Sequence, residues 1–197
     1  MIQSATRLPS ALAGERVVLR RWVASDVAAL AEAVARNTEH LRPWMPWIEH
    51  EPLPDSERAE LFQTWERSYL DGGDVVYGVF LSGSPIGGCG LHKRRGPNGL
   101  EIGYWIDKDH INQGIATEVA RVLTSAALSV PGVTFVEIHH DKANIASSRV
   151  PQKLGYTLVG ETQDSVTSPG EVGIDCTWRI EAADWTAFPP VPRSCVP

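Results

Sequence analysis

The stretch HINQGIATEVA, from His110 to Ala120, places one glycine between a polar loop and the first turn of an expected helix. The first N–H groups of a helix have no partner inside it, and the helix dipole adds partial positive charge, so such an end can bind an anion. Gly114 lets the backbone approach a ligand closely, and Ala116 and Thr117 leave room beside it. A plain turn from strand to helix would use the same residues. The spacing alone therefore leaves both interpretations open.

Several other chemical motifs do not occur in the sequence. No Gly-Lys-Ser/Thr follows Gly114, and neither Gly-x-Gly-x-x-Gly nor Gly-x-Ser-x-Gly occurs, which disfavours a P-loop, a dinucleotide-binding fold and an esterase. The three cysteines are far apart, with no metal-ligand spacing. His139 and His140 would point to opposite faces of a strand, so they are poor joint ligands. We expect no metal site.

The expected elements form a mixed α+β domain, and this loop connects a strand in the middle of the sheet to the next helix. Short β-branched runs predict strands, and apolar residues at helical spacing predict helices. Residues 41–54 are rich in proline and tryptophan, which excludes a regular helix there. Pro151 predicts a kink in its helix, or a helix that begins near Ser147. The expected strands are 16–22, 75–81, 85–93, 99–107, 133–140, 156–161 and 170–180, and the expected helices are 24–37, 56–70, 115–130 and 144–155.

The helix after the loop has a clear apolar face, which includes Ile115, Val119 and Leu123. Glu118, Arg121 and Ser125 fall on its other face. The strand before the loop alternates apolar residues such as Ile102 with residues such as Glu101. The loop thus joins a half-polar strand to an amphipathic helix.

The composition is that of a globular protein and limits its partners. The chain has 197 residues, 43% hydrophobic and 21% charged, which is typical of one domain with a core. We expect one domain over residues 1–197, with its core at about 15–181 and a loose proline-rich tail at 186–197. A formal charge of −6 disfavours a nucleic-acid partner. No apolar run is long enough to span a membrane and no secretory signal is evident, so we expect a cytoplasmic protein without a membrane partner.

Two motifs together resemble the GNAT acetyltransferase superfamily. The family's loop, usually written Gln/Arg-x-x-Gly-x-Gly/Ala, is similar to Ile111–Ala116, although Ile111 departs from the usual residue. The downstream pattern Asn-x-x-Ser-x-x-Val-x-x-Lys-Leu-Gly-Phe/Tyr is matched between Asn144 and Tyr156. The resemblance extends over about residues 15–181. Within the superfamily, LRPWMPW and LEIGYWI look most similar to the Rim-type enzymes that acetylate the N-termini of ribosomal proteins.

The resemblance implies acetyl-coenzyme A (acetyl-CoA) as co-substrate, in a GNAT-like, mostly antiparallel twisted sheet flanked by helices. It implies that loop amides bind the pyrophosphate, that the pantetheine runs beside the strand ending at Asp107, and that Asn144 hydrogen-bonds to it. A backbone N–H near Ile106 could stabilise the developing oxyanion. Ile111 is unusual at its position, which implies the loss of one side-chain contact to the cofactor. The implied cofactor-binding residues are Trp105, Ile106, Asp107, Asn112, Gln113, Gly114, Ile115, Ala116, Thr117, Asn144, Ser147 and Lys153.

The implied reaction is direct acetyl transfer to a primary amine. An ammonium must first lose a proton to a base, and the departing thiolate can take one from an acid. Glu101 matches a position that is frequently acidic and is the candidate base, with Asp164 as a weaker one; a solvated strand glutamate is equally consistent with Glu101. Ser147 and Tyr156 are the candidate acids, although Ser147 could instead cap a helix and Tyr156 could belong to the core.

The family layout implies that Trp44, Met45, Trp47 and Asp164 line the acceptor cleft. Two acceptor classes stay open, a protein N-terminus and a small cationic amine such as a polyamine or an antibiotic. The acidic balance, with Glu49, Glu51 and Asp55 near the tryptophans, leans toward the second. A catalytically silent coenzyme A-binding regulatory protein is the alternative that Ile111 permits. Homodimers are common among similar proteins, but no residue here establishes one.

Overall fold

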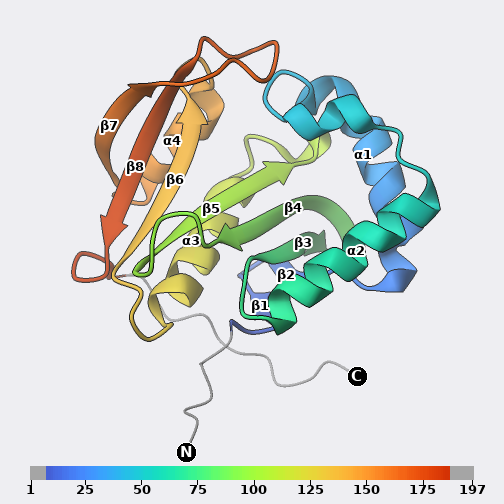
Figure 1. The fold of residues 1–197 in the computed structure, drawn as a ribbon, viewed down its shortest axis with the longest axis horizontal. Helices are drawn as coiled ribbons and strands as arrows, with labels where there is room; N and C mark the ends of the chain where they lie inside the picture. Colours follow the sequence, from blue (N-terminus) through green and yellow to red (C-terminus); the bar gives the residue numbers. More distant parts are fainter. Residues whose placement is uncertain (1–7, 187–197) are drawn as a thin grey trace, which may run out of the picture.

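The computed structural model describes residues 8–186 and contains one eight-stranded sheet in the order β1-β2-β3-β4-β5-β6-β8-β7 (Figure 1). Neighbouring strands are antiparallel except β5 and β6, which are parallel. The expected fold class, a mostly antiparallel sheet flanked by helices, is confirmed. The strands are β1 Ala11–Ala13, β2 Val17–Arg21, β3 Val75–Leu81, β4 Ser84–His92, β5 Gly99–Ile106, β6 Phe135–Asp141, β7 Thr157–Gln163 and β8 Ile174–Glu181; the helices are α1 Val27–Leu41, α2 Asp55–Leu70, α3 Ile115–Leu128 and α4 Ile145–Lys153, with short 3-10 turns η1 Ala24–Asp26, η2 Pro46–His50 and η3 Lys108–His110.

Most of the differences from the expected elements lie at element ends. Strand β1 was not expected, because three residues are too few to carry a pattern. Helix α1 runs four residues further than expected, to Leu41, which is buried and continues its apolar face. The proline-rich and tryptophan-rich segment contains the turn η2. Most of the tail expected to be loose lies outside the described residues.

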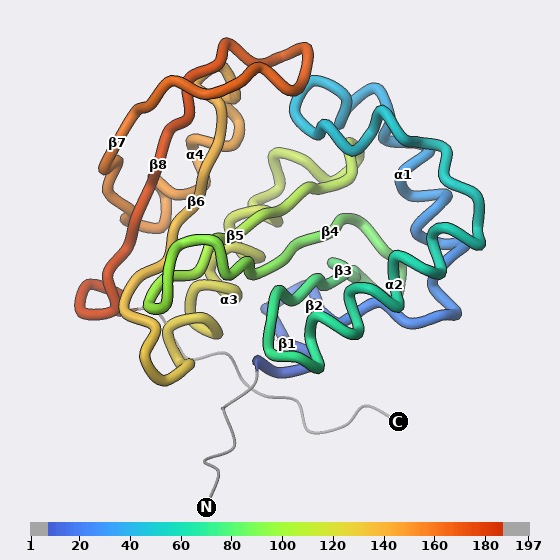
Figure 2. Tube along the Cα trace, viewed as in Figure 1, coloured from blue at the N-terminus to red at the C-terminus, as the bar shows by residue number. Residues whose placement is uncertain are grey.

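Two apolar cores cover the two faces of the sheet. One core packs α3 against β-strand residues such as Tyr77, Val79 and Leu91. The other packs α1 and α2 against Trp22 and Phe80. Since side chains alternate along a strand, Val79 and Phe80 enter different cores. The tube in Figure 2 shows α1 and α2 together on one side of the sheet. No helix in residues 8–186 is long and apolar enough to span a membrane.

The second face of α3 is partly buried. Glu118 and Ser125 are both buried. The Glu118 carboxylate accepts hydrogen bonds from the N–H groups of Arg16 and Val17 and from the Arg16 side chain. Trp185 covers Ser125 and donates to its hydroxyl. Segments distant in sequence therefore cover a face whose polar residues are satisfied internally.

Helix α4 contains Pro151 and nevertheless begins at Ile145. Proline removes the N–H that would bind the carbonyl four residues earlier, which is that of Ser147. The Tyr104 hydroxyl lies 3.4 Å from this carbonyl oxygen and donates to it. A strand residue thereby compensates for the missing helical hydrogen bond, and α4 is held against β5.

Candidate active site

The site is built where β5 and β6 separate. Their parallel pairing ends at Ile102 and Ile138, and β5 continues to Ile106 without a partner on β6 (Figure 1). The N–H of Asp107 donates to Ile86 of β4. Because backbone N–H groups alternate between the two sides of a strand, the N–H of Ile106 faces the gap beside β6. The gap therefore presents a backbone donor to any group that enters it.

A cavity of about 1020 Å³ lies on the face of the sheet that carries α1 and α2, and it reaches the N-terminal end of α4. Eight of the site residues that the sequence implied line this cavity. The glycine loop and the side chains of Ile106, Asp107, Lys153 and Tyr156 do not line it. The eight lining residues are Trp44, Met45, Trp47, Glu101, Trp105, Asn144, Ser147 and Asp164.

The glycine loop has the backbone shape of an anion site. Gly114 has φ +79° and directly precedes α3, and Asn112 also has a positive φ of +59°. Arg16 was not expected here; it donates to the Gln113 carbonyl at 2.8 Å and to Glu118 at 2.9 Å. Its remaining nitrogen, Nη2, lies 3.5 Å from where a Cβ on Gly114 would stand. The first-turn amides and this guanidinium fit a pyrophosphate, while the Ile111 side chain is exposed.

The Asp107 side chain is turned away from the cavity. Its carboxylate binds Arg36 and Asn37 of α1 at 2.6 and 2.9 Å and accepts the N–H of Asp109. Burial alone would raise the pKa of Asp107, but these donors lower it to about 2. Asp107 thus fastens α1 to the end of β5, and any contact with a cofactor there would have to use its backbone.

Asn144 and Ser147 lie at the N-terminus of α4. Asn144 caps the helix, since its side-chain oxygen accepts the N–H of Ser147 at 3.1 Å. The Ser147 hydroxyl is 3.1 Å from that of Tyr104, and burial raises the pKa of Tyr104 to about 12. Because Tyr104 donates its proton to the Ser147 carbonyl, the Ser147 hydroxyl is the member of this pair that can turn a proton toward the cavity. Tyr104 was missed because its strand position marked it only as an alternating residue.

Tyr156 and Lys153 lie outside the cavity. The Tyr156 hydroxyl is buried and 2.6 Å from Thr124 of α3. Burial raises the pKa of Tyr156 well above its ordinary value. Lys153 is exposed in the last turn of α4. Tyr156 is therefore a core residue, which is the alternative role that the sequence analysis left open for it.

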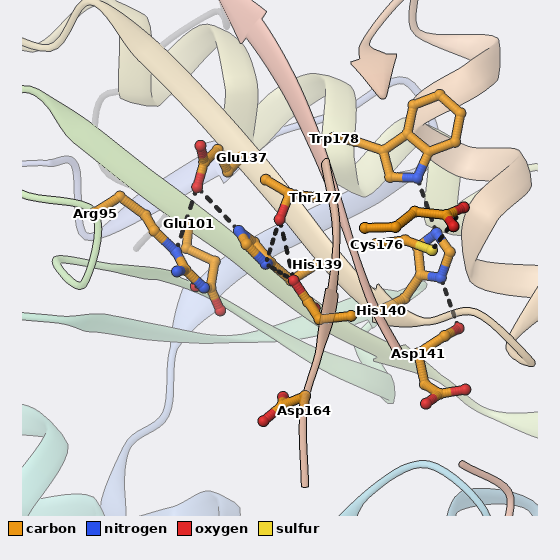
Figure 3. Close-up of polar contacts among 12 residues, drawn as sticks. Arg95, Glu101, Glu137, His139, His140, Asp141, Asp164, Cys176, Thr177 and Trp178 are labelled. Carbon is orange, nitrogen blue, oxygen red and sulfur yellow. Dashed lines mark hydrogen bonds and ion pairs between the residues drawn. The ribbon is translucent and has the colours of Figure 1, made fainter. Parts of the chain in front are cut away.

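Glu101 is buried on the cavity wall within a network of charges (Figure 3). Arg95 donates to its carboxylate at 2.7 Å, and Arg94 lies 3.5 Å from it. Arg95 also lies 3.4 Å from Glu137 of β6. The Glu101 carboxylate is thus already paired with two guanidinium groups.

His139 continues this network toward β8. Its Nε2 is 2.9 Å from Glu137 and its Nδ1 is 2.8 Å from Asp175. Burial alone would lower the pKa of His139, but the two carboxylates raise it. A ring that donates from both nitrogens is an imidazolium, so His139 has no lone pair with which to accept a proton.

The stability of the fold should depend on the charge of His139. Because its folded-state pKa is raised above about 6.5, the stabilisation is complete below about pH 6.5 and is lost as the pH rises through the folded-state value. We expect His139→Gln to lower the melting temperature more at about pH 6 than at about pH 9. Melting curves recorded across this range test it. An equal loss at both pH values would contradict the assignment.

His140 has its tautomer fixed by its partners. Trp178 donates to Nε2 at 2.9 Å, and Nδ1 is 2.8 Å from the Asp141 carbonyl, to which it donates (Figure 3). This ring is therefore neutral with the proton on Nδ1. Asp164 stands apart from the network in Figure 3. Within residues 8–186, no group of three or more His, Cys, Asp or Glu side chains is arranged to hold a metal ion.

The aromatic segment is fixed to the sheet and to α2. The rings of Trp47 and Trp105 lie 6.3 Å apart. Glu51 was expected to attract a cationic acceptor, but it is buried in an ion pair of 2.7 Å with Arg58. Its carboxylate also accepts the N–H of Leu53. Glu51 therefore anchors the segment that carries the tryptophans.

Comparisons with known proteins agree with this geometry. The family model described as acetyltransferase (GNAT) domain matches residues 16–157. The chain is 29% identical over 153 residues to the Bacillus subtilis (strain 168) protein named "Putative ribosomal N-acetyltransferase YdaF", covering 77% of this chain and 84% of that protein.

Two solved structures share the fold at lower identity. RimL, a ribosomal L7/L12 alpha-N-protein acetyltransferase in complex with coenzyme A, has a TM-score of 0.78 at 20% identity, covering 89% of this chain and 98% of that one. The microcin C7 self immunity acetyltransferase MccE, in complex with acetyl-CoA and AMP, has a TM-score of 0.79 at 16% identity, covering 90% and 98%. With the family model matching most of its length, the chain belongs to the GNAT acetyltransferase family.

Proposed function

We propose that this protein transfers the acetyl group of acetyl-CoA to a primary amine. One observation carries the proposal: β5 and β6 separate beyond Ile102 and Ile138, and Gly103, Tyr104 and Trp105 of the unpaired part of β5 line the cavity. A thioester lying in such a gap would be accessible to an amine in the cavity. The co-substrate supplies an activated acetyl group, and the residues of this chain bind, orient and move protons.

The residues around the gap fit coenzyme A from one end to the other. The amides of residues 112–117, with Arg16, would hold the pyrophosphate. Trp105 and Ile106 flank the gap, and the N–H of Ile106 would stabilise the oxygen that becomes negative during attack. Asn144 caps the N-terminus of α4 and lines the cavity, whereas Lys153 lies in the last turn of that helix.

Ser147 is the preferred acid for the departing thiolate, because its hydroxyl lines the cavity and contacts that of Tyr104. Tyr156, the other candidate, is bonded to Thr124 and does not line the cavity. Glu101 and Asp164 both line it, which keeps them available for the acceptor amine. The Glu101 carboxylate could hold an ammonium nearby, where it already pairs with Arg95 and Arg94.

The first acceptor class we propose is a protein or peptide N-terminus. The relative YdaF carries a ribosomal N-acetyltransferase name and matches over most of its length, which supports this class. An acceptor screen with N-terminal peptides, polyamines and cationic antibiotics, monitored by thiol release, tests it. Acetylation of peptides at their α-amine is the expected result.

A small cationic amine is the second class, and the cavity itself favours it. Seven carboxylates and two arginines line the cavity, so its field attracts cations. Preferential acetylation of polyamines or antibiotics in the same screen would select this class over peptides.

Replacing Asn144 with alanine should weaken acetyl-CoA binding. The substitution removes both the proposed amide contact and the cap of α4, which is worth about 1 kcal/mol. Asn144→Ser separates the two effects, since serine can cap the helix but cannot make the amide contact. We expect weaker binding in both variants, by calorimetry, and a lower melting temperature in the alanine variant only. Normal acetyl-CoA binding in both variants would contradict the proposed contact with Asn144.

A further inference from the structure

A histidine and an aspartate that the sequence did not single out form a dyad at the edge of the cavity. The Nδ1 of His92, the last residue of β4, is 2.8 Å from the Asp74 carboxylate. The other carboxylate oxygen accepts the N–H of Lys93 at 2.8 Å. Burial alone would raise the pKa of Asp74, but these hydrogen bonds lower it. An ionised Asp74 keeps the proton of the neutral imidazole on Nδ1, and so leaves the lone pair on Nε2.

Glycines on two strands make room for this imidazole. A Cβ on Gly90 would lie 3.0 Å from His92 Nε2, and a Cβ on Gly103 would lie 3.4 Å from it. His92 lines the cavity together with both glycines, and its Nε2 has no hydrogen-bond partner among residues 8–186. Gly103 is also the first residue of β5 beyond its pairing with β6. The free lone pair therefore lies at the start of the gap proposed for the thioester.

We infer that His92 is the general base that deprotonates the acceptor amine and that Asp74 positions it, an inference that rests on the proposed acetyl transfer. The ammonium gives one proton to His92 Nε2, which passes it to solvent. As the nitrogen–carbon bond forms and the carbon–sulfur bond breaks, the nitrogen loses a second proton and the thiolate gains one. The products are an amide and a thiol, and one proton is released.

The other titratable groups on this wall are less suited to the task. Glu101, the cross-strand neighbour of His92, is paired with Arg95 and Arg94. His139 is held as an imidazolium by two carboxylates, and Nε2 of His140 accepts from Trp178. His92 thus combines an oriented tautomer with an open nitrogen. Glu101 would instead hold the acceptor cation beside it.

Steady-state kinetics across pH on the full chain test this role, with acetyl-CoA and the amine that the wild-type protein acetylates. General bases typically contribute 10²–10⁴-fold, so we expect His92→Gln to lower kcat by about 100-fold or more while acetyl-CoA binding is unchanged. A reaction that needs an unprotonated base slows on the acid side, and this limb of the wild-type pH profile should disappear in His92→Gln. Glu101→Gln should keep the limb. His40→Gln, in the last turn of α1 and away from the cavity lining, is the matched control and should behave as wild type.

Asp74→Asn tests the positioning role. We expect a loss in kcat smaller than that of His92→Gln, with a shifted acid limb and unchanged acetyl-CoA binding. A limb that persists in His92→Gln and vanishes in Glu101→Gln would overturn the inference and assign the base to Glu101. If wild type acetylates no amine, the proposed function itself fails. A His92→Gln defect restricted to folding, seen as a lowered melting temperature with normal kcat, would also overturn it.

Discussion

Replacing Arg58 with methionine is expected to destabilise the protein by about 3–5 kcal/mol. The side chains of Arg58 and Glu51 are 3% and 6% exposed, and their ion pair is 2.7 Å long. Methionine fills part of the volume but leaves the Glu51 carboxylate buried without its cation, which is the costly outcome. Urea unfolding at neutral pH measures the loss. A loss below about 1 kcal/mol, the ordinary value for exposed pairs, would show that the pair is not buried as described.

The double variant Glu51→Gln/Arg58→Met separates the charge from the packing. If the penalty comes from an uncompensated charge, the double variant should be more stable than Arg58→Met alone. The pair also fixes the segment with Trp44 and Trp47, so the KM of the acceptor should rise in Arg58→Met while acetyl-CoA binding changes little. If the single and double variants lose equal unfolding free energy, the destabilisation comes from lost packing and not from an uncompensated charge.

Gly114→Val is expected to weaken acetyl-CoA binding at least tenfold. Gly114 adopts φ +79°, a conformation that costs an L-residue about 1–2 kcal/mol and a β-branched residue more. The loop can relieve this strain only by turning, which moves the amides of residues 115–117 from the position proposed for the pyrophosphate. Since about 1.4 kcal/mol corresponds to a factor of ten, the predicted loss is measurable by titration calorimetry.

Gly132→Val is the matched control for backbone strain. Gly132 has φ +88° and, like Gly114, no tight contact at its Cβ position, but it follows α3 rather than preceding it. Both variants should lose stability, and only Gly114→Val should lose affinity for acetyl-CoA. Equal affinity in the two variants would show that the loop does not hold the co-substrate.

The family and the order of elements could be predicted because they depend on local patterns. The glycine loop and the residues between Asn144 and Tyr156 are contiguous stretches whose residue types carry the pattern directly. The spacing of apolar residues along the chain likewise predicted the order of the helices and strands. Element ends were less accurate, as with the four extra residues of α1, because the last apolar position is fixed by tertiary packing.

The polar partners of the site could not be predicted, because they join residues far apart in sequence. Arg16 meets Gln113 across 97 positions, and the register of β4 with β5 brings Glu101 opposite His92. Tyr156 and Ser147 both matched a motif, yet only Ser147 lines the cavity. A motif gives the residue type, whereas strand register and helix packing decide where its functional atom points.

The central claim is acetyl transfer to an amine, and a single assay tests it most directly. Purified protein is incubated with acetyl-CoA and N-terminal peptides, polyamines or cationic antibiotics, while thiol release and the mass of the acceptor are recorded together. We predict sustained thiol release that requires an acceptor and an equal amount of N-acetylated product. Binding of acetyl-CoA without acetylation of any amine would contradict the claim and favour a silent coenzyme A-binding regulatory protein.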